Sequence, residues 1–219
     1  VPKAEYEFMG LKCSIGDVTH RIQASELQDK GVLANCHVNV LQTQDHPMFK
    51  TYAEELKWLT TDKVRMAWVA KTIKDISTSG NTLILVDRIS AGEILQEQIE
   101  DAVFVSGSTK NTDRKEQYDE VSTATNKVII ATYGVASVGI NIPRIFNLVL
   151  IEPGKSFVRV IQSIGRGIRK AEDKENVQIW DITSSCKFAK RHLGARKKFY
   201  KEANYPYTIE KINYENPYT

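Results

Sequence analysis

The stretch Thr82-Leu83-Ile84-Leu85-Val86 is a short, almost unbroken apolar run, and Asp87-Arg88 follows it directly. Runs of this kind are typical of strands buried on both faces of a parallel sheet. Upstream, apolar residues recur every three or four positions between Met66 and Ile76, with lysines and an arginine on the opposite stripe. This spacing predicts an amphipathic helix that is capped by Asp62 and leads into the buried strand.

The same alternation of strands and helices continues along the chain. Further strands are predicted at 37–42, 102–105, 127–131, 148–151 and 177–180, with an edge strand near 207–212. Helices are predicted over about 91–99, from 112 or 113 to 123, from 156, and over about 187–202. Strands that alternate with helices of this length imply βαβ units, so we predict one three-layer α/β domain with a mostly parallel sheet.

The first 35 residues do not resemble the start of an independent fold. Ser25 and Gln28 form a capping box, and Gly31 ends one or two helical turns. We therefore expect residues 1–35 to be a linker or arm and residues 36–219 to be the domain, which closes with a basic helix and a tyrosine-rich tail.

Composition excludes several classes of protein. The chain has 42% hydrophobic and 26% charged residues, and no apolar run approaches the roughly 20 residues that cross a bilayer. The first residues lack the apolar region of a signal peptide. The three cysteines are far apart and not in metal-ligand spacing, so we expect a cytoplasmic protein (host cytoplasm if viral) with no metal site and no membrane partner.

Ligands of open parallel sheets gather at the carboxyl ends of the strands. The loops predicted there are rich in groups that bind phosphate, and the longest runs from Thr132 to Asn141. Candidate donors to a phosphodiester oxygen are the hydroxyls of Thr132 and Ser137 and the amides of Gly134 and Gly139. Asn141 is placed to bind a ribose hydroxyl. A glycine-rich loop alone is weak support, but this one follows a buried strand and precedes an arginine motif.

That motif is Gln162-Ser163-Ile164-Gly165-Arg166-Gly167-Ile168-Arg169. On a helix, Arg166 and Arg169 point to one side, with Gln162 one turn back on roughly the same face. Two permanently charged guanidinium groups beside glycines suit the stabilisation of phosphoryl transfer by an arginine finger.

Together these stretches resemble the second RecA-like domain of superfamily-two helicases over roughly residues 38–182. The Thr132–Asn141 loop corresponds to motif five, and Gln162–Arg169, with its Q-x-x-G-R-x-x-R pattern, to motif six. Asp87-Arg88 and Ser106-Gly107, with Arg114 in the next helix, match the family more loosely. The short arm and the basic carboxyl-terminal helix are most similar to bacteriophage UvsW-type DNA helicases.

The resemblance implies a role for each matching residue. Arg169 would be the arginine finger that reaches the γ-phosphate of ATP, with Arg166 a second phosphate contact and Gln162 a link from the nucleotide to motif five. Gly139 and Asn141 would touch the sugar of the nucleotide. The residues expected to contact the nucleic acid are Thr132, Gly134, Ser137, Ser106 and Gly107. The alternative for the two arginines is an ion pair with Glu152 or Asp181 that involves no phosphate.

The sequence contains no G-x-x-x-x-G-K-[ST] phosphate loop. Because this family builds its ATP site between two RecA-like domains, we expect the chain to supply one wall of that site. ATP and Mg would be held in the intact protein, mainly by a first RecA-like domain, and this piece alone would be inactive. The expected substrate is single-stranded or branched DNA, with an RNA helicase or a restriction-complex motor as alternatives.

A second signal lies between Cys186 and Lys201, where seven lysines and arginines occur without an acid. Such a run attracts nucleic-acid phosphate, and we name Arg196, Lys197 and Lys198 as candidate contacts. It also leaves open a non-catalytic nucleic-acid-binding module, or simply a solvated helix face.

Overall fold

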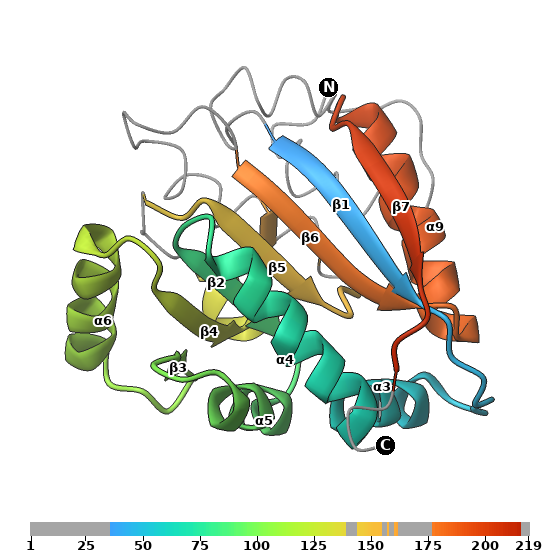
Figure 1. Ribbon diagram of the computed structural model, residues 1–219, viewed down its shortest axis with the longest axis horizontal. Helices are drawn as coiled ribbons and strands as arrows, with labels where there is room; N and C mark the ends of the chain where they lie inside the picture. The colour runs from blue at the N-terminus through green and yellow to red at the C-terminus, as the bar shows by residue number, and fades with distance from the viewer. Residues whose placement is uncertain (1–35, 139–143, 155–156, 158–159, 162–176, 216–219) are drawn as a thin grey trace.

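The computed structural model describes residues 36–138, 144–154, 157, 160–161 and 177–215 (Figure 1). In this part of the chain, seven strands form one sheet in the order β3-β4-β2-β5-β6-β1-β7, and every pairing is parallel. The strands are β1 (Cys36–Thr43), β2 (Thr82–Val86), β3 (Val103–Val105), β4 (Val128–Thr132), β5 (Asn147–Ile151), β6 (Val177–Ser184) and β7 (Tyr207–Ile212). The predicted α/β class and parallel sheet are confirmed.

The described helices alternate with these strands. They are α3 (Tyr52–Thr61), α4 (Lys63–Ser77), α5 (Ile89–Gln98), α6 (Asn111–Thr123), α7 (Tyr133–Ser137) and α9 (Lys187–Glu202). As predicted, Asp62 caps α4, because its carboxylate accepts a hydrogen bond from the amide of Arg65 at 2.9 Å. Phe157, Val160 and Ile161 are also helical and buried, at the i, i+3, i+4 spacing of an inward helix face.

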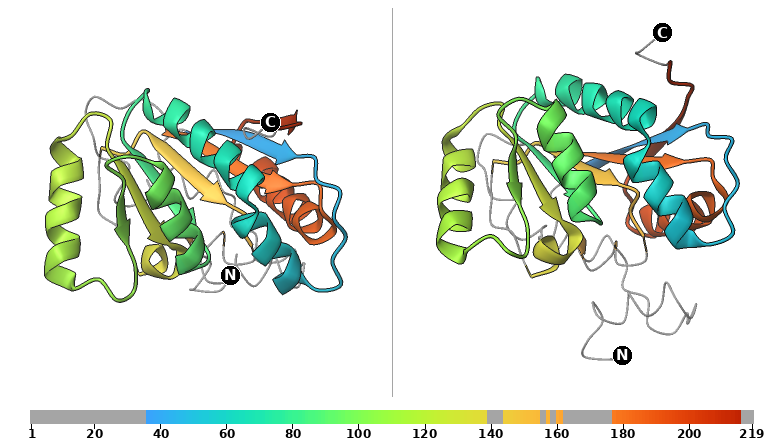
Figure 2. Two further views of the ribbon diagram at one scale, coloured as in Figure 1. Left: turned by 60° about the horizontal axis from the view of Figure 1, so that its bottom comes forward. Right: turned by 90° about the horizontal axis from the view of Figure 1, so that it is seen from below.

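Two hydrophobic clusters fill the space on the two faces of the sheet. One combines α4 and α5 with strand residues such as Ile84 and Ile130, and the other combines α7 and α9 with the alternate residues Leu85 and Ala131. Figure 2 shows α4 and α9 on opposite sides of the sheet. The strands are therefore covered on both faces, which explains the unbroken apolar run at β2.

Two elements differ from the sequence prediction. Helix α3 was not predicted, although Thr51 and Glu54 form a capping box at its start. The predicted loop from Thr132 to Asn141 begins instead with the short helix α7, and residues 139–143 lie outside the described residues. The predicted helix near Ser25 also lies outside them.

The end of the described chain folds back over the carboxyl edge of the sheet. The Tyr214 ring stacks on Trp68 of α4 with centroids 6.1 Å apart, and its hydroxyl donates to Asp45. The buried thiols of Cys36 and Cys186 are not in a disulfide. Within the described ranges, no helix has both the length and the apolarity needed to cross a membrane.

Candidate functional site

The candidate site is the edge of the sheet where the parallel strands end. The structure brings two predicted segments to neighbouring places there, because Ser106-Gly107 follows β3, Thr132 ends β4, and these two strands are paired. The other predicted site residues, Gly139, Asn141, Gln162, Arg166 and Arg169, lie outside the described residues.

Helix α7 begins directly at the end of β4. The Thr132 hydroxyl caps it by accepting a hydrogen bond from the amide of Val135 at 3.3 Å, and the Ser137 hydroxyl donates to the carbonyl of Gly134 at 2.7 Å. The buried Tyr133 hydroxyl donates to the carbonyl of Ile151 at 2.9 Å, which ties α7 to β5. Gly134 is exposed. Ser137 thus already donates within the turn, whereas the Thr132 hydroxyl only accepts in its hydrogen bond and is not used there as a donor.

The turn after β3 is held by α6. Arg114 Nη2 donates to the carbonyls of Ser106 and Gly107, each at 2.9 Å, and the amide of Ser106 donates to the Thr109 hydroxyl at 3.0 Å. Gly107 is exposed, and a β-carbon added there would meet nothing within 4 Å. The turn therefore has a fixed shape and an open outer surface.

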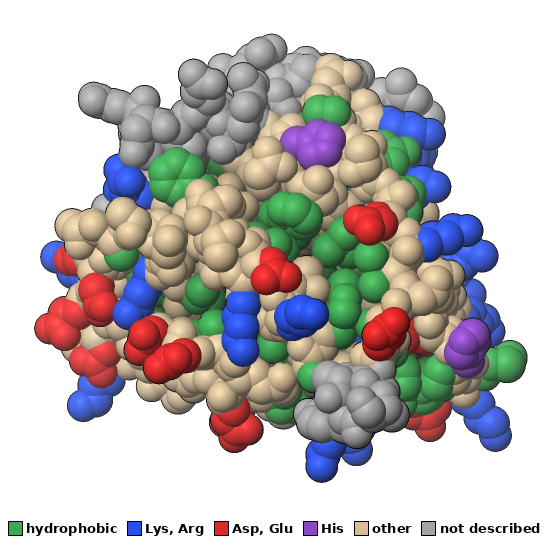
Figure 3. Space-filling view, in the orientation of Figure 1, with side chains coloured by type: hydrophobic (Ala, Val, Ile, Leu, Met, Phe, Trp, Pro, Cys, Tyr) green, Lys and Arg blue, Asp and Glu red, His purple; other side chains and the backbone are tan. Residues whose placement is uncertain are grey.

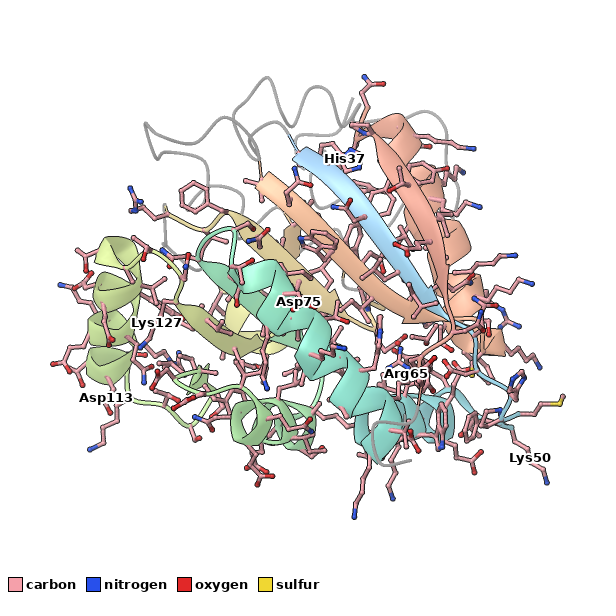
Figure 4. The ribbon with its side chains drawn as sticks, in the orientation of Figure 1. His37, Lys50, Arg65, Asp75, Asp113 and Lys127 are labelled. Carbon is pink, nitrogen blue, oxygen red and sulfur yellow. The ribbon has the colours of Figure 1, made fainter. Side chains whose placement is uncertain are left out.

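The turn after β5 is built very differently, around the buried side chain of Arg65. This guanidinium donates to Glu152, to the carbonyl of Leu59 at 2.6 Å and to the Thr43 hydroxyl at 3.1 Å. Glu152 has a positive φ of 46°, and its amide donates to the carbonyl of Ile182 at 2.9 Å. Figure 4 shows Arg65 in α4, beside the ends of β1 and β6.

A second buried arginine holds the next residue of the same turn. Arg196 Nε and Nη2 donate to the two carboxylate oxygens of Asp181 at 2.8 and 2.9 Å, and Nη1 donates to the carbonyl of Pro153 at 2.6 Å. The Tyr200 hydroxyl also donates to Asp181, at 2.7 Å. Arg196 is only 3% exposed, so its prediction as a surface nucleic-acid contact is wrong. Lys198 is exposed and Lys197 is half-buried.

Arg65 and Arg196 fix the turn at Glu152-Pro153, which precedes the arginine motif in the sequence. Phe157 packs edge-on against Phe199 and Tyr200 of α9, at centroid distances of 5.3 and 5.5 Å. A β-carbon on Gly154 would lie 3.1 Å from the Tyr52 hydroxyl, so α3 also closes on the turn. Residues of α3, α4 and α9 therefore hold the turn at 152–154, through which the chain passes from β5 into the next helix. We call this turn and the side chains that hold it the platform.

This arrangement bears on the alternative for Arg166 and Arg169. Among the described residues, Glu152 already has Arg65 as its ion-pair partner and Asp181 already has Arg196. Both carboxylates are buried. Because each is already paired with a guanidinium, an ion pair with either is a less favourable arrangement for the motif arginines.

Burial dominates the electrostatics of this platform. It raises the pKa of Glu152 from 4.5 to about 7, although the nearby charges of Arg65 and Arg196 pull it downward. Burial by itself would lower the pKa of Arg196, but the attraction of Asp181 outweighs it and the pKa is raised. Burial also raises the pKa values of Tyr133 and Tyr200, which stay protonated donors.

Glu55 was missed from the sequence together with α3. Its carboxylate accepts hydrogen bonds from the amides of Phe188 and Ala189, at 3.0 and 2.9 Å, and so caps the start of α9. Among the described residues, no three His, Cys, Asp or Glu side chains are grouped so that they could hold a metal ion. The carboxylates at this edge serve the structure of the platform.

Comparison with known proteins gives a consistent assignment. Residues 64–171 match the family model described as the helicase conserved C-terminal domain. The chain is 27% identical over 229 residues to the ATP-dependent DNA helicase uvsW of Enterobacteria phage T4, covering 95% of this chain and 45% of that protein. It therefore spans less than half the length of this curated relative.

Solved structures share the fold. The crystal structure of T4 UvsW superposes with a TM-score of 0.71 at 22% identity, covering 81% of this chain and 42% of that one. Dbp5 of S. cerevisiae, bound to RNA and ADP BeF3, gives a TM-score of 0.51 at 14% identity, covering 83% of this chain and 42% of that one. Residues 64–171 thus match a helicase C-terminal domain, and the chain has a RecA-like fold similar to that of T4 UvsW.

Proposed function

We propose that the chain is the second motor domain of an ATP-dependent DNA helicase that moves along the phosphate backbone and remodels branched or duplex DNA. The observation that carries the proposal is the helicase family match over residues 64–171, a range that includes the sequence motifs Thr132–Asn141 and Gln162–Arg169. The similarity to a phage DNA helicase supports DNA as the substrate.

In this mechanism the domain supplies part of a shared ATP site. Arg169 is the arginine finger, Arg166 a second phosphate contact and Gln162 the link to motif five, while Gly139 and Asn141 contact the sugar. ATP and Mg are held mainly by a first RecA-like domain. This division agrees with the lack of a phosphate loop in the sequence and with the use of the edge carboxylates in structural ion pairs.

The described residues contribute the track for the nucleic acid. Two adjacent turns carry Ser106, Gly107, Thr132, Gly134 and Ser137, and each turn presents an exposed glycine that lets a phosphate approach the backbone closely. Because the Ser137 hydroxyl already donates within α7, we assign direct phosphate contact to backbone amides in these turns and to the Thr132 hydroxyl, which only accepts in α7.

The test compares ATP turnover by the isolated chain and by the whole protein that contains it, with and without DNA. The expected result is stimulation by DNA in the whole protein and no turnover by the chain alone. Turnover by the isolated chain would overturn the shared-site proposal.

An RNA-remodelling motor is the second candidate, because the RecA-like fold is shared with the RNA-bound Dbp5 structure. Single-stranded DNA and RNA of equal length and sequence separate the two candidates. Stimulation of the whole protein's ATP turnover by DNA alone supports the DNA helicase, and stimulation by RNA alone replaces it with the RNA motor.

A further inference from the structure

The outer surface of α9 carries a line of positive charge. Lys187, Lys190, Arg191, Lys198 and Lys201 are exposed and recur at helical spacing; we call them the α9 basic face. At 1.5 Å per residue the line is about 21 Å long. In Figure 3, Lys and Arg side chains gather along the right-hand edge of the molecule, where Figure 1 places α9, whereas acidic side chains gather near α6.

None of these five side chains forms an ion pair with another described residue, in contrast to Arg196 on the inner side of the same helix. Like charges three or four residues apart, such as Lys187 with Lys190 and Lys198 with Lys201, destabilise a helix. Lys187 and Arg191 lie over the ring of the half-buried Phe188, at 5.4 and 5.6 Å from its centroid. All five cations are nevertheless exposed, whereas Leu193, Phe199 and Tyr200 of the same helix are buried. The clustering of like charge therefore weakens the helix, and these side chains lie outside the buried core.

The middle of the α9 basic face is bare. Gly194 and Ala195 are both exposed, and a β-carbon added at Gly194 would meet nothing within 4 Å. Packing thus does not require glycine, and glycine inside a helix is less stable than alanine. A residue without a side chain between clusters of cations allows a bulky chain of phosphates to approach the helix backbone.

We propose that the α9 basic face binds the phosphate backbone of duplex nucleic acid. Its length matches about six base pairs at a rise of 3.4 Å each. Single strands are generally bound through base stacking on aromatic rings, whereas Phe199 and Tyr200 of this helix are buried. Helices α7 and α9 pack on the same face of the sheet, so a duplex arm on α9 lies on the side of α7. The proposal extends the proposed function by adding a duplex contact outside the motor track.

The test measures binding of the 219-residue chain to a 20-base-pair duplex without ATP, by fluorescence anisotropy at several salt concentrations. One variant neutralises the α9 basic face (Lys190→Gln, Arg191→Gln, Lys198→Gln). The matched control makes the same charge change on the exposed side of α4, across the sheet (Lys63→Gln, Lys71→Gln, Lys74→Gln). Circular dichroism verifies that both variants fold.

The α9 variant is expected to lose roughly tenfold or more in affinity. The slope of its log affinity against log salt concentration is expected to become less negative by about 2 to 3. The α4 control is expected to stay within about twofold of the parent. Equal losses in both variants would reduce the effect to net charge and overturn the proposal, as would no loss in either.

A second variant tests close approach to the helix backbone at Gly194 without changing the charge. Gly194→Leu leaves the charge unchanged but fills the bare centre, so duplex affinity is expected to fall while helix content is kept. Unchanged affinity contradicts a close approach at Gly194.

Binding of the parent chain to anionic vesicles but not to duplex would assign this surface to a membrane and overturn the proposal. Because no ATP is present, either failure leaves the motor function untouched and is distinguishable from its failure.

Discussion

The carboxyl edge of the sheet has two halves that are built from different interactions. Where β5, β6 and β1 end, two buried arginines pair with buried carboxylates, and Arg65 and Arg196 both hold the turn at Glu152-Pro153. Where β3 and β4 end, Arg114 instead binds two backbone carbonyls, and the described residues there form no buried ion pair. The first, which we call the paired half, is buried and held by ion pairs. The second, which we call the open half, has exposed glycines at Gly107 and Gly134.

The two halves differ in how firmly they hold the backbone and in how much of it they leave exposed. Buried ion pairs fix a backbone segment strongly, because breaking one leaves a charge without solvent or partner. Turns shaped by hydroxyls and carbonyl contacts hold their form while leaving outer amides accessible. The paired half thus fixes the backbone turn after β5, and the open half leaves backbone groups exposed, where the proposed function places the nucleic acid.

The largest expected effect is on the paired half. Arg196→Met leaves the buried carboxylate of Asp181 without its guanidinium, so the free energy of unfolding in urea is expected to fall by about 3 to 5 kcal/mol. The matched variant Lys198→Met, two residues along the same helix, is expected to change it by less than about 0.5 kcal/mol. The double variant Arg196→Met, Asp181→Leu is expected to regain much of the loss. Similar effects of the two single variants would contradict the assignment of Arg196 to the core.

The next effect depends on pH. The pKa of Glu152 is raised to about 7 in the folded protein, above its ordinary value of 4.5, so the native state binds a proton that the unfolded state has released between these values. Its contribution to stability is therefore complete below about pH 4.5 and is lost as the pH rises through 7, by up to about 3 kcal/mol.

Glu152→Gln removes this titration. The difference in unfolding free energy between the parent and this variant is expected to decrease from pH 4.5 to 7.5. A difference that increases with pH would show instead that Arg65 keeps the pKa of Glu152 below its ordinary value.

A smaller effect is expected in the open half. Arg114→Met removes the two hydrogen bonds from Nη2 to the carbonyls of Ser106 and Gly107, which solvent then partly replaces. We expect a loss of about 1 to 2 kcal/mol in unfolding free energy, together with faster hydrogen exchange at Ser106–Thr109. A loss as large as that of Arg196→Met would erase the distinction between the halves.

Periodicity predicted most of the sheet and helices, because strands such as β2 and helices such as α9 have uninterrupted local patterns. Position 196 was misread from the charge of its neighbours. Its spacing from Leu193 and Tyr200 places it on the inner face, and this signal was present in the sequence. Asp181 likewise lies in phase with the buried Val177 and Ile179 of β6.

Other features had no local signal. Arg65 and Glu152 are 87 residues apart, and their pairing follows from the neighbouring positions of α4 and the end of β5 in the fold. Tertiary structure alone brings such groups together. Helix α3 is different, because its capping box at Thr51 and the helical spacing of Leu56 and Leu59 were readable in the sequence.

The proposed role of Arg169 as the arginine finger of a shared ATP site can be tested directly. Its most direct test is single-turnover ATP hydrolysis by the whole protein with Arg169→Ala, with Lys71→Ala on the outer side of α4 as the control. Arg169→Ala is expected to retain ATP binding but to hydrolyse ATP about three orders of magnitude more slowly, or slower still, while the control keeps the parent rate. Unchanged turnover in Arg169→Ala would contradict it.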